Sequence, residues 1–469
     1  MENPGSGGLK RVLTLSDLIL FGLAFVGPTA PYSMYGIATA RSEGHLPLVY
    51  LLAMVAMSLT AVSYGRMAVA FPQAGSTYVY ASRALHPLAG FLAGWGMMLD
   101  YVLVPLLSVI FVALTASKLL PEVSYFAWAV LTAGGITWIN LRGIKVTAHA
   151  NSVLNAVMIG SLVWFVLAAC RALLGGTGEG TLLSLKPFYN PDTFSQTAIL
   201  GATSLAALSF LGFDGITTLS EEARNPARDI GRATVIVCLV AGCLFVLQSY
   251  LAQLVWPDYR EFNPVETAFM DVGRRVGGAA LFYGISFVLL VGGLASAITG
   301  QASASRLLLG MGRDRVLPPR IFAYVHPRLG TPTYSVLIMG GVHLVGALLL
   351  RYTEAAELVN FGALAGFMMV NLAVSRHYFF AQGQRRGTAS IANFVLPVLG
   401  FLFCLNLWVH LTGFALRLGT FWMVLGLLHL SVLTRGFNRQ RLTAIWQRQM
   451  SGPQDACGGT DASSDRHGA

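Results

Sequence analysis

The stretch FVGPTAPYSMYG, residues 25–36, interrupts the first long apolar run of this chain. It contains Pro28 and Pro31, and Gly27 and Gly36 lie close by. Proline lacks a backbone N–H donor and glycine is a poor helix former. If the run crosses a membrane, unpaired backbone groups in its middle are costly. Such a break is either a simple kink or part of a binding site.

The amino-acid composition indicates that this run crosses a membrane. The 469 residues are 55% hydrophobic and 11% charged, whereas soluble domains carry about 25% charged residues. Apolar runs of about 20 residues, enough to span a bilayer, recur from residue 15 to residue 435. The composition predicts an all-α polytopic membrane protein. We expect twelve transmembrane helices, at about 15–40, 46–70, 86–117, 122–141, 147–173, 195–222, 233–256, 281–311, 332–351, 355–380, 391–413 and 416–435.

The charges predict an orientation. If both termini are cytoplasmic, 22 of the 31 Lys and Arg residues fall on the inner side, as the positive-inside rule requires. We therefore expect a multi-pass protein of the cell (inner) membrane, and the excess of arginine over lysine is typical of a GC-rich bacterium. Although the net charge is +10, the basic residues form no stripe with interleaved aromatic residues. Nucleic acid is therefore not an expected partner. Two polar stretches, 71–85 and 223–232, are expected as short elements at the cytoplasmic surface.

A second break lies in the sixth span, in SFLGFDGITTLSEE, residues 209–222, where Gly212 and Gly215 bracket Asp214. Breaks in spans 1 and 6 predict an inverted repeat with a site at the bilayer midplane. Half-helix N-termini suit a carboxylate, and freed carbonyls suit an ammonium group or a cation. The expected division is a cytoplasmic N-terminus (1–14), a first repeat (15–173), a second repeat (195–380), two further helices (391–435) and a cytoplasmic tail (436–469) with a disordered end.

Four stretches carry a family resemblance: FPQAGSTYVYASRALHPLAGFLAGW (71–95), LDYVLVP (99–105), SFLGFDGITTLSEEARNPARDIGRA (209–233) and ASRLLLGMGRDRVLP (304–318). Together they resemble the amino acid–polyamine–organocation superfamily of secondary transporters, and within it the putrescine importer branch. The resemblance implies a leucine-transporter-type fold with helices 1–5 and 6–10 as inverted repeats and two peripheral helices. It implies a permease that imports amino acids or polyamines such as putrescine, coupled to protons, by alternating access.

The resemblance also assigns substrate-binding residues by position. Tyr32, Phe210 and Phe213 are candidates for an aromatic lid. The broken segments contribute Gly27, Pro28, Thr29 and Ala30 from helix 1, and Gly212 and Asp214 from helix 6.

Acidic residues inside membrane spans are rare and usually functional. Asp100 lies midway along span 3 and is followed by Tyr101, a pair found there in amino acid relatives. A diamine needs two anionic or carbonyl-rich ends, which Asp100 and Asp214 can supply. The alternative is an ion pair or a bond to freed backbone groups.

Other polar residues are candidates for coupling or gating. Glu221 and Glu222, followed by three arginines, predict a salt-bridged inner gate or helix terminus rather than a substrate contact. Ser296 and Ser303 are candidates for binding an ion near helix 1. The cationic run 306–328 is interpreted as following the positive-inside rule alone.

One departure from the family concerns coupling. Span 5 lacks the lysine that proton-coupled relatives carry, and the nearest position is Met158. Coupling would then run through Asp100 or Glu221, or be absent, as in an exchanger.

The expected partners are a small-molecule substrate, a co-transported proton and the lipid bilayer, with no metal and no cofactor. The five cysteines include no CxxC pair and the histidines lack ligand spacing. A neutral amino acid permease or an exchanger remains an alternative. A membrane enzyme or receptor is disfavoured, since no nucleophile–base constellation is evident. The oligomeric state is left open.

Overall fold

The computed structural model describes residues 9–120, 122–262, 267–350, 352–409, 411 and 413–436. Within these ranges the chain is helical and has no strand, only an isolated bridge between Leu13 and Ala223. The tail end predicted to be disordered lies outside the described residues.

The first predicted repeat contains seven described helices, of which α1 and α2 form the first span. They are α1 (Leu15–Val26), α2 (Pro31–Arg41), α3 (Leu46–Ala70), α4 (Ser76–Ala84), α5 (Pro87–Leu119), α6 (Tyr125–Leu141) and α7 (Ile144–Leu174).

The second predicted repeat again begins with a broken helix. Its elements are α8 (Gln196–Ala207), η1 (Leu208–Phe210), η2 (Phe213–Leu219), α9 (Pro226–Val255), η3 (Tyr259–Glu261), α10 (Ala268–Arg313), α11 (Pro319–Phe322), α12 (Thr333–Leu349) and α13 (Tyr352–Val374). The remaining elements are η5 (Ser375–Ala381), α14 (Thr388–Ser390), η6 (Ile391–Val395), α15 (Leu396–Val409) and α16 (Gly413–Thr434).

The helices bear out the membrane class. Among the described residues, nine helices are long and apolar enough to cross a bilayer, or ten when α1 and α2 count as one broken span. The other two predicted spans coincide with α6 and α12, which have 17 residues each. The total of twelve spans and the inverted repeat stay predictions.

Both predicted breaks are present. Thr14 and Asp17 form a capping box that begins α1, and α1 ends at Gly27, whose φ of 79° favours glycine. Pro31 then occupies the first turn of α2, and the two helices are bent by 53°. In the second break, α8 passes through η1 to Gly212, whose φ is 110°, and continues as the 3₁₀-helix η2.

The two expectations about surface elements are each wrong in one respect. Residues 226–232 are the first turns of α9 rather than a separate element, because Pro226 is well placed to begin a helix, although Arg224, Arg228 and Arg232 are exposed as expected. In the stretch 71–85, helix α4 forms, but its residues 76–82 are buried. Its backbone fits closely against α5, since a Cβ atom on Gly90 would lie 2.5 Å from the Cα of Ser82.

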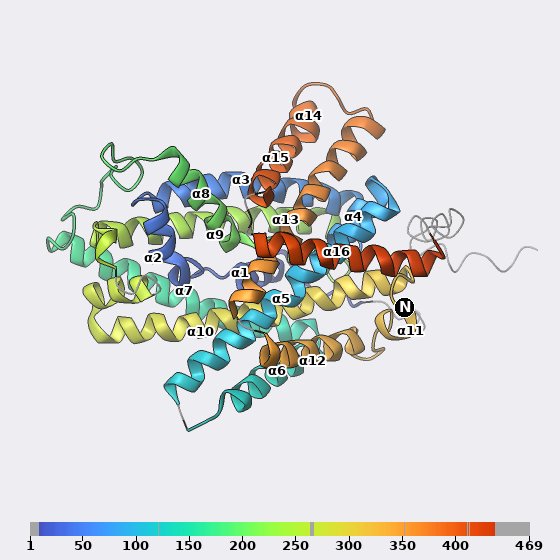
Figure 1. Cartoon of the computed structure of the whole chain (residues 1–469), viewed down its shortest axis with the longest axis horizontal. Helices are drawn as coiled ribbons and strands as arrows, with labels where there is room; N and C mark the ends of the chain where they lie inside the picture. The colour runs from blue at the N-terminus through green and yellow to red at the C-terminus, as the bar shows by residue number, and fades with distance from the viewer. Residues whose placement is uncertain are drawn as a thin grey trace, which may run out of the picture.

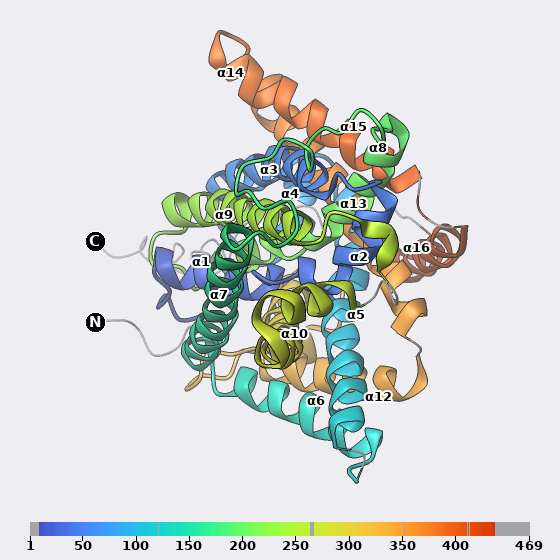
Figure 2. The ribbon, with the colours of Figure 1, turned by 90° about the vertical axis from the view of Figure 1, so that its left-hand side faces the viewer.

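The helices run mainly along the long axis of the molecule, with α1 near the centre (Figures 1 and 2). Helices α3 and α9 lie side by side, and a Cβ on Gly65 would lie 3.0 Å from the Cα of Gly231. Helices α6 and α12 flank one side, and α14 and α15 project from the other. The breaks of α1 and of α8–η2 are thereby enclosed by other helices.

Candidate functional site

A cavity of about 300 Å³ lies at the break between α1 and α2. Its wall also includes parts of α5, η1, α10 and α13, and Leu211. No charged side chain lines it among the described residues. The polar lining residues are Thr29, Ser33, Ser108, Ser209, Ser296 and Asn360. A mostly apolar cavity with a few converging polar groups is the usual form of a small-molecule site.

Neighbouring helices bind the carbonyl groups that the α1 break releases. The Ser296 hydroxyl of α10 donates to the Phe25 carbonyl oxygen at 2.7 Å. The Gln248 side-chain amide of α9 donates to the Pro28 carbonyl oxygen at 3.0 Å. These hydrogen bonds satisfy two backbone carbonyl oxygens at the break. Without such partners, unpaired carbonyl groups inside a membrane would be costly.

We expect Ser296→Ala to slow transport severalfold and to lower stability by about 1 kcal/mol, because it removes one hydrogen bond from the break. Uptake rate and the thermal unfolding midpoint of the purified protein measure both effects. Ser286→Ala is the matched control, since the Ser286 hydroxyl bonds to the Phe282 carbonyl of its own helix. Equal effects of the two substitutions would contradict a special role for Ser296.

The two breaks meet at Phe25, as the inverted-repeat hypothesis requires. A Cβ on Gly212 would lie 2.7 Å from the Phe25 Cγ atom, and a Cβ on Gly215 would lie 2.6 Å from its Cδ1 atom. The Phe25 ring also lies 6.3 Å from the Tyr101 ring, centroid to centroid. Phe25 therefore forms a floor of the cavity and separates it from η2.

Two buried carboxyl groups, those of Asp100 and Asp214, do not line the cavity. Asp100 precedes Val104, Leu107 and Phe111 on the cavity-lining stripe of α5, at helical spacing. Neither Asp100 oxygen has a hydrogen-bond partner among the described residues. Asp214 accepts a hydrogen bond from the Tyr101 hydroxyl and lies close enough to Asp100 to interact electrostatically. The structure thus brings together Asp100, Tyr101 and Asp214, and their role in substrate binding stays a prediction.

The three proposed lid aromatics lie elsewhere. The Phe210 ring packs against Phe245 at 5.1 Å, and the Phe213 ring packs against Phe367 at 5.2 Å. The Tyr32 ring stacks on Phe269 at 4.0 Å. None of the three lines the cavity in this conformation. The lid role stays a prediction.

The other predicted residues divide between the cavity and its surroundings. Gly27, Thr29, Ala30 and Ser296 line the cavity, whereas Pro28 and Gly212 do not. Ser303 is buried next to Gly215, whose added Cβ would lie 2.9 Å from the Ser303 hydroxyl oxygen. Met158 packs at the α1 break, because a Cβ on Gly292 would meet both its sulfur and the Thr29 hydroxyl oxygen. Met158, which stands at the span 5 position where a lysine is absent, therefore adjoins the cavity wall.

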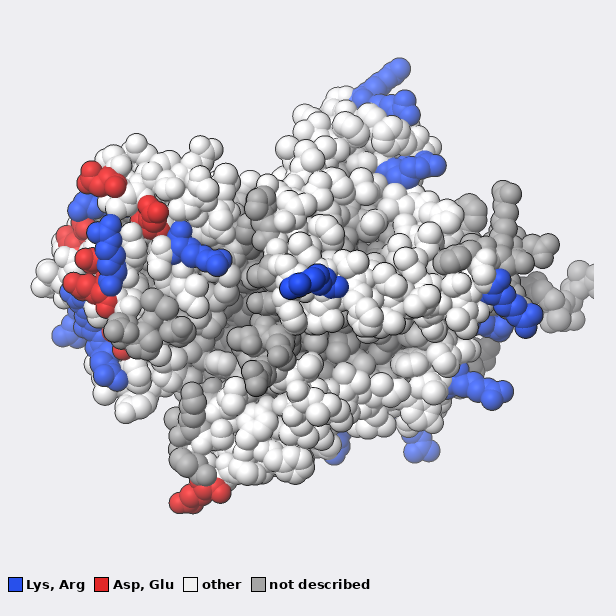
Figure 3. All heavy atoms as spheres, in the orientation of Figure 1, with Lys and Arg blue, Asp and Glu red and all other residues white. Residues whose placement is uncertain are grey.

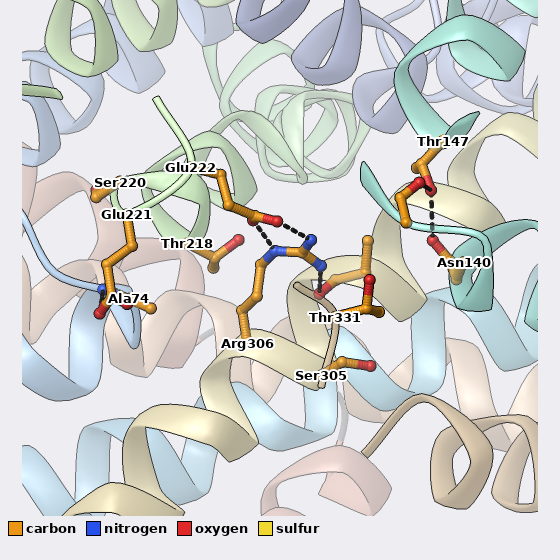
Figure 4. Close-up of polar contacts among 12 residues, drawn as sticks. Ala74, Asn140, Thr147, Thr218, Ser220, Glu221, Glu222, Ser305, Arg306 and Thr331 are labelled. Atoms are coloured by element: carbon orange, nitrogen blue, oxygen red, sulfur yellow. Dashed lines mark hydrogen bonds and ion pairs between the residues drawn. The ribbon is translucent and has the colours of Figure 1, made fainter. Parts of the chain in front are cut away.

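Two ion pairs join the segment after η2 to α10, and Figure 4 shows the one between Glu222 and Arg306. Glu222 and Arg306 are both buried, and the Arg306 Nη2 atom donates to Glu222 Oε1 at 2.8 Å. Glu221 pairs with Arg313 at 2.5 Å and accepts the Ala74 amide at 3.1 Å. The interpretation that the run 306–328 follows the positive-inside rule alone is therefore incomplete for Arg306, which forms a buried ion pair. Its guanidinium lies inside because helix α10 faces the end of η2.

The segment before α1 is hydrogen-bonded to the residues that follow η2. The backbone amides of Val12 and Leu13 donate to the Glu222 carbonyl oxygen at 2.8 and 2.9 Å. The Arg224 amide donates back to the Leu13 carbonyl at 2.9 Å. The α1 and η2 ends are thus bonded to each other on the side opposite the α2 end of the cavity.

Several residues of this region are not evident from the sequence motifs. Gln248 and Asn360 are polar residues inside apolar runs. Because polar residues are rare in membrane spans, this position alone marks both as candidates. Ser108 and Ser209 carry a weaker signal, because serine is common in membrane helices. Phe25 could not be recognised as a floor from sequence, since its role depends on two glycines far along the chain.

The comparison with known proteins decides the family. The amino acid permease family model matches residues 17–432. The chain belongs to the amino acid permease family. The permease is 33% identical over 430 residues to a low-affinity putrescine importer of Escherichia coli (strain K12), covering 92% of this chain and 95% of the relative.

Two further relatives show the breadth of this similarity. A branched-chain amino acid permease of Bacillus subtilis (strain 168) is 27% identical to the permease, with 90% of this chain and 93% of the relative covered. A methylthioribose transporter of the same organism is 28% identical, with 79% and 81% covered. The predicted superfamily is confirmed. The family and its relatives also confirm that the permease is a membrane transporter and not an enzyme.

Proposed function

We propose that this permease imports a small primary amine of the putrescine class together with protons. The proposal rests on Asp100, because both of its buried carboxylate oxygens lack a hydrogen-bond partner among the described residues. A buried carboxylate without a partner is unfavourable unless a proton or another cation neutralises it. A protonated amine and a coupling proton are two cations that would meet this need. The similarity to a putrescine importer supports the amine.

Transport would proceed by alternating access around the breaks. The cavity lies on the α2 side of the α1 break, while Glu222 with Arg306 and Glu221 with Arg313 close the opposite side. We interpret this arrangement as a state of the transport cycle in which the inner gate is closed. Breaking the two ion pairs would let α1 and η2 separate from α10 and release the substrate. Rearrangement of this kind would also bring Phe210 or Phe213 toward the site.

The orientation rests on charge. On the face drawn in Figure 3, acidic residues gather at the end that carries the α2 terminus, and the opposite end shows only Lys and Arg. Helix α11 lies at that basic end, and Lys10, which precedes α1, donates to the Arg328 carbonyl oxygen in the loop after α11. The positive-inside rule makes the basic end cytoplasmic, so we place both termini inside a bacterial cell membrane.

A neutral amino acid permease is the second candidate. The observation that favours it is the cavity lining, which has no charged side chain among the described residues. The relative that carries branched-chain amino acids is consistent with it. An exchanger is a variant of either candidate, because Met158 replaces the lysine of proton-coupled relatives.

The test is uptake of labelled putrescine into proteoliposomes, with an inward proton gradient or with the gradient collapsed by an ionophore. A gradient of one pH unit stores about 1.4 kcal/mol per proton and can hold about a tenfold accumulation. We expect gradient-dependent accumulation that unlabelled putrescine abolishes and unlabelled leucine does not. Accumulation of leucine instead would overturn the amine proposal in favour of the second candidate. Counterflow without net uptake would show an exchanger.

A further inference from the structure

A hairpin formed by residues 375–395, from η5 through α14 to η6, projects sideways from the helix bundle (Figures 1 and 2). Residues 380–388 at its tip are all exposed. We call this segment the projecting hairpin. Because it extends laterally from a membrane-spanning bundle, its surroundings are lipid and headgroups rather than other helices of this chain.

The projecting hairpin carries positive charge without a protein counterion. Arg376, Arg385 and Arg386 are exposed, and none forms an ion pair among the described residues. The sequence contains no Asp or Glu from Leu358 to Gln454. Lys and Arg atoms stand out on the projecting part in Figure 3, with no acidic atoms beside them on that face. An external anion is the natural partner of such a group.

Local contacts hold one of these side chains in place. The Arg385 Nε atom donates to the Phe379 carbonyl oxygen at 3.0 Å, and the guanidinium lies 5.4 Å from the Phe379 ring centroid. The Asn393 amide of η6 donates to the Gln384 carbonyl at 3.3 Å across the hairpin. The guanidinium fork is therefore partly ordered before it meets a ligand, which favours bidentate recognition of phosphate.

The remaining surface of the projecting hairpin is apolar. Phe380 and Ile391 are 51% and 52% exposed, and Phe394 and Val395 are 36% and 43% exposed. Aromatic and aliphatic groups next to arginines are typical of the boundary between acyl chains and headgroups. A soluble anion would contact the arginines but leave these side chains uncovered.

We propose that the projecting hairpin is a binding site for anionic phospholipid. Arg385 and Arg386 contact the headgroup phosphate, Arg376 adds to the attraction, and the Phe380 and Ile391 side chains pack on the acyl chains. The site is separate from the transport cavity, so the proposal does not depend on which substrate the permease carries.

Native mass spectrometry of the full chain in a neutral detergent tests this, with phosphatidylglycerol or phosphatidylcholine as the added lipid. Each arginine near a lipid surface contributes about fivefold in affinity. We therefore expect phosphatidylglycerol to bind about 25-fold more tightly than phosphatidylcholine. The double variant R385Q/R386Q should lose that preference while keeping its unfolding midpoint, because both side chains are exposed.

Arg417→Gln is the matched control. Arg417 is also exposed, lies in the same acid-free stretch and donates from Nε to a backbone carbonyl, that of Gly413, at 3.1 Å. It should keep the lipid preference. An unchanged preference in R385Q/R386Q, an equal loss in the control, or no preference in the wild type would overturn the proposal. Full competition by equimolar glycerol phosphate would assign the site to a soluble phosphate and overturn the lipid assignment.

Discussion

Replacing Arg306 by methionine should lower the free energy of unfolding by about 3–5 kcal/mol, because it leaves the buried Glu222 carboxylate without its partner. Both side chains are almost fully enclosed, and the Arg306 Nη1 atom also donates to the Ala302 carbonyl at 2.8 Å. Breaking such a pair from one side costs far more than removing both charges. The unfolding midpoint of the purified variant measures the loss.

Two further variants make this result interpretable. Arg320→Met removes an exposed arginine from the neighbouring α11 and should change stability by less than about 0.5 kcal/mol. The double variant E222M/R306M should regain most of the stability, since two apolar side chains replace the pair. If the pair is an inner gate, transport by the double variant stays impaired although the fold is restored. Transport by the double variant at the wild-type rate would show that the ion pair only stabilises the fold.

Asp100→Asn and Asp214→Asn should each lower proton-driven uptake about 100-fold, a loss of about 3 kcal/mol in stabilisation of the transported state. Asparagine keeps the shape of the side chain but can neither carry the negative charge nor hold the coupling proton. Initial uptake rates in proteoliposomes, corrected for the amount of inserted protein, measure the effect. Asp192→Asn, in the exposed segment before α8, is the control and should transport normally.

The double variant D100N/D214N separates a shared site from two independent ones. Groups that act on the same cation are strongly non-additive. We therefore expect the double variant to transport no worse than the poorer single variant. A multiplied loss would argue for two independent roles, and normal uptake by either single variant would contradict the proposed site.

Several features of this permease follow from local sequence. The two breaks were predictable because proline and glycine restrict or free the backbone at their own positions, as at Gly27, Pro31 and Gly212. The spans were predictable because each apolar run must satisfy its backbone within one helix. Asp100 and Asp214 stood out because acidic residues are rare in such runs. The family motifs added the transporter class, which the comparisons bear out.

Other features depend on the tertiary structure, because they join segments far apart in the chain. The sequence predicts that Glu222 lies in a salt-bridged gate or helix terminus, but its partner, Arg306, lies 84 residues later and is identified only by the packing of α10. The rings of Phe210 and Phe213 lie away from the cavity because they pack on Phe245 of α9 and Phe367 of α13, which are distant in the sequence. Residue type and spacing determine where a helix breaks. Which side chains then face the cavity is decided by the packing of helices from both halves of the chain.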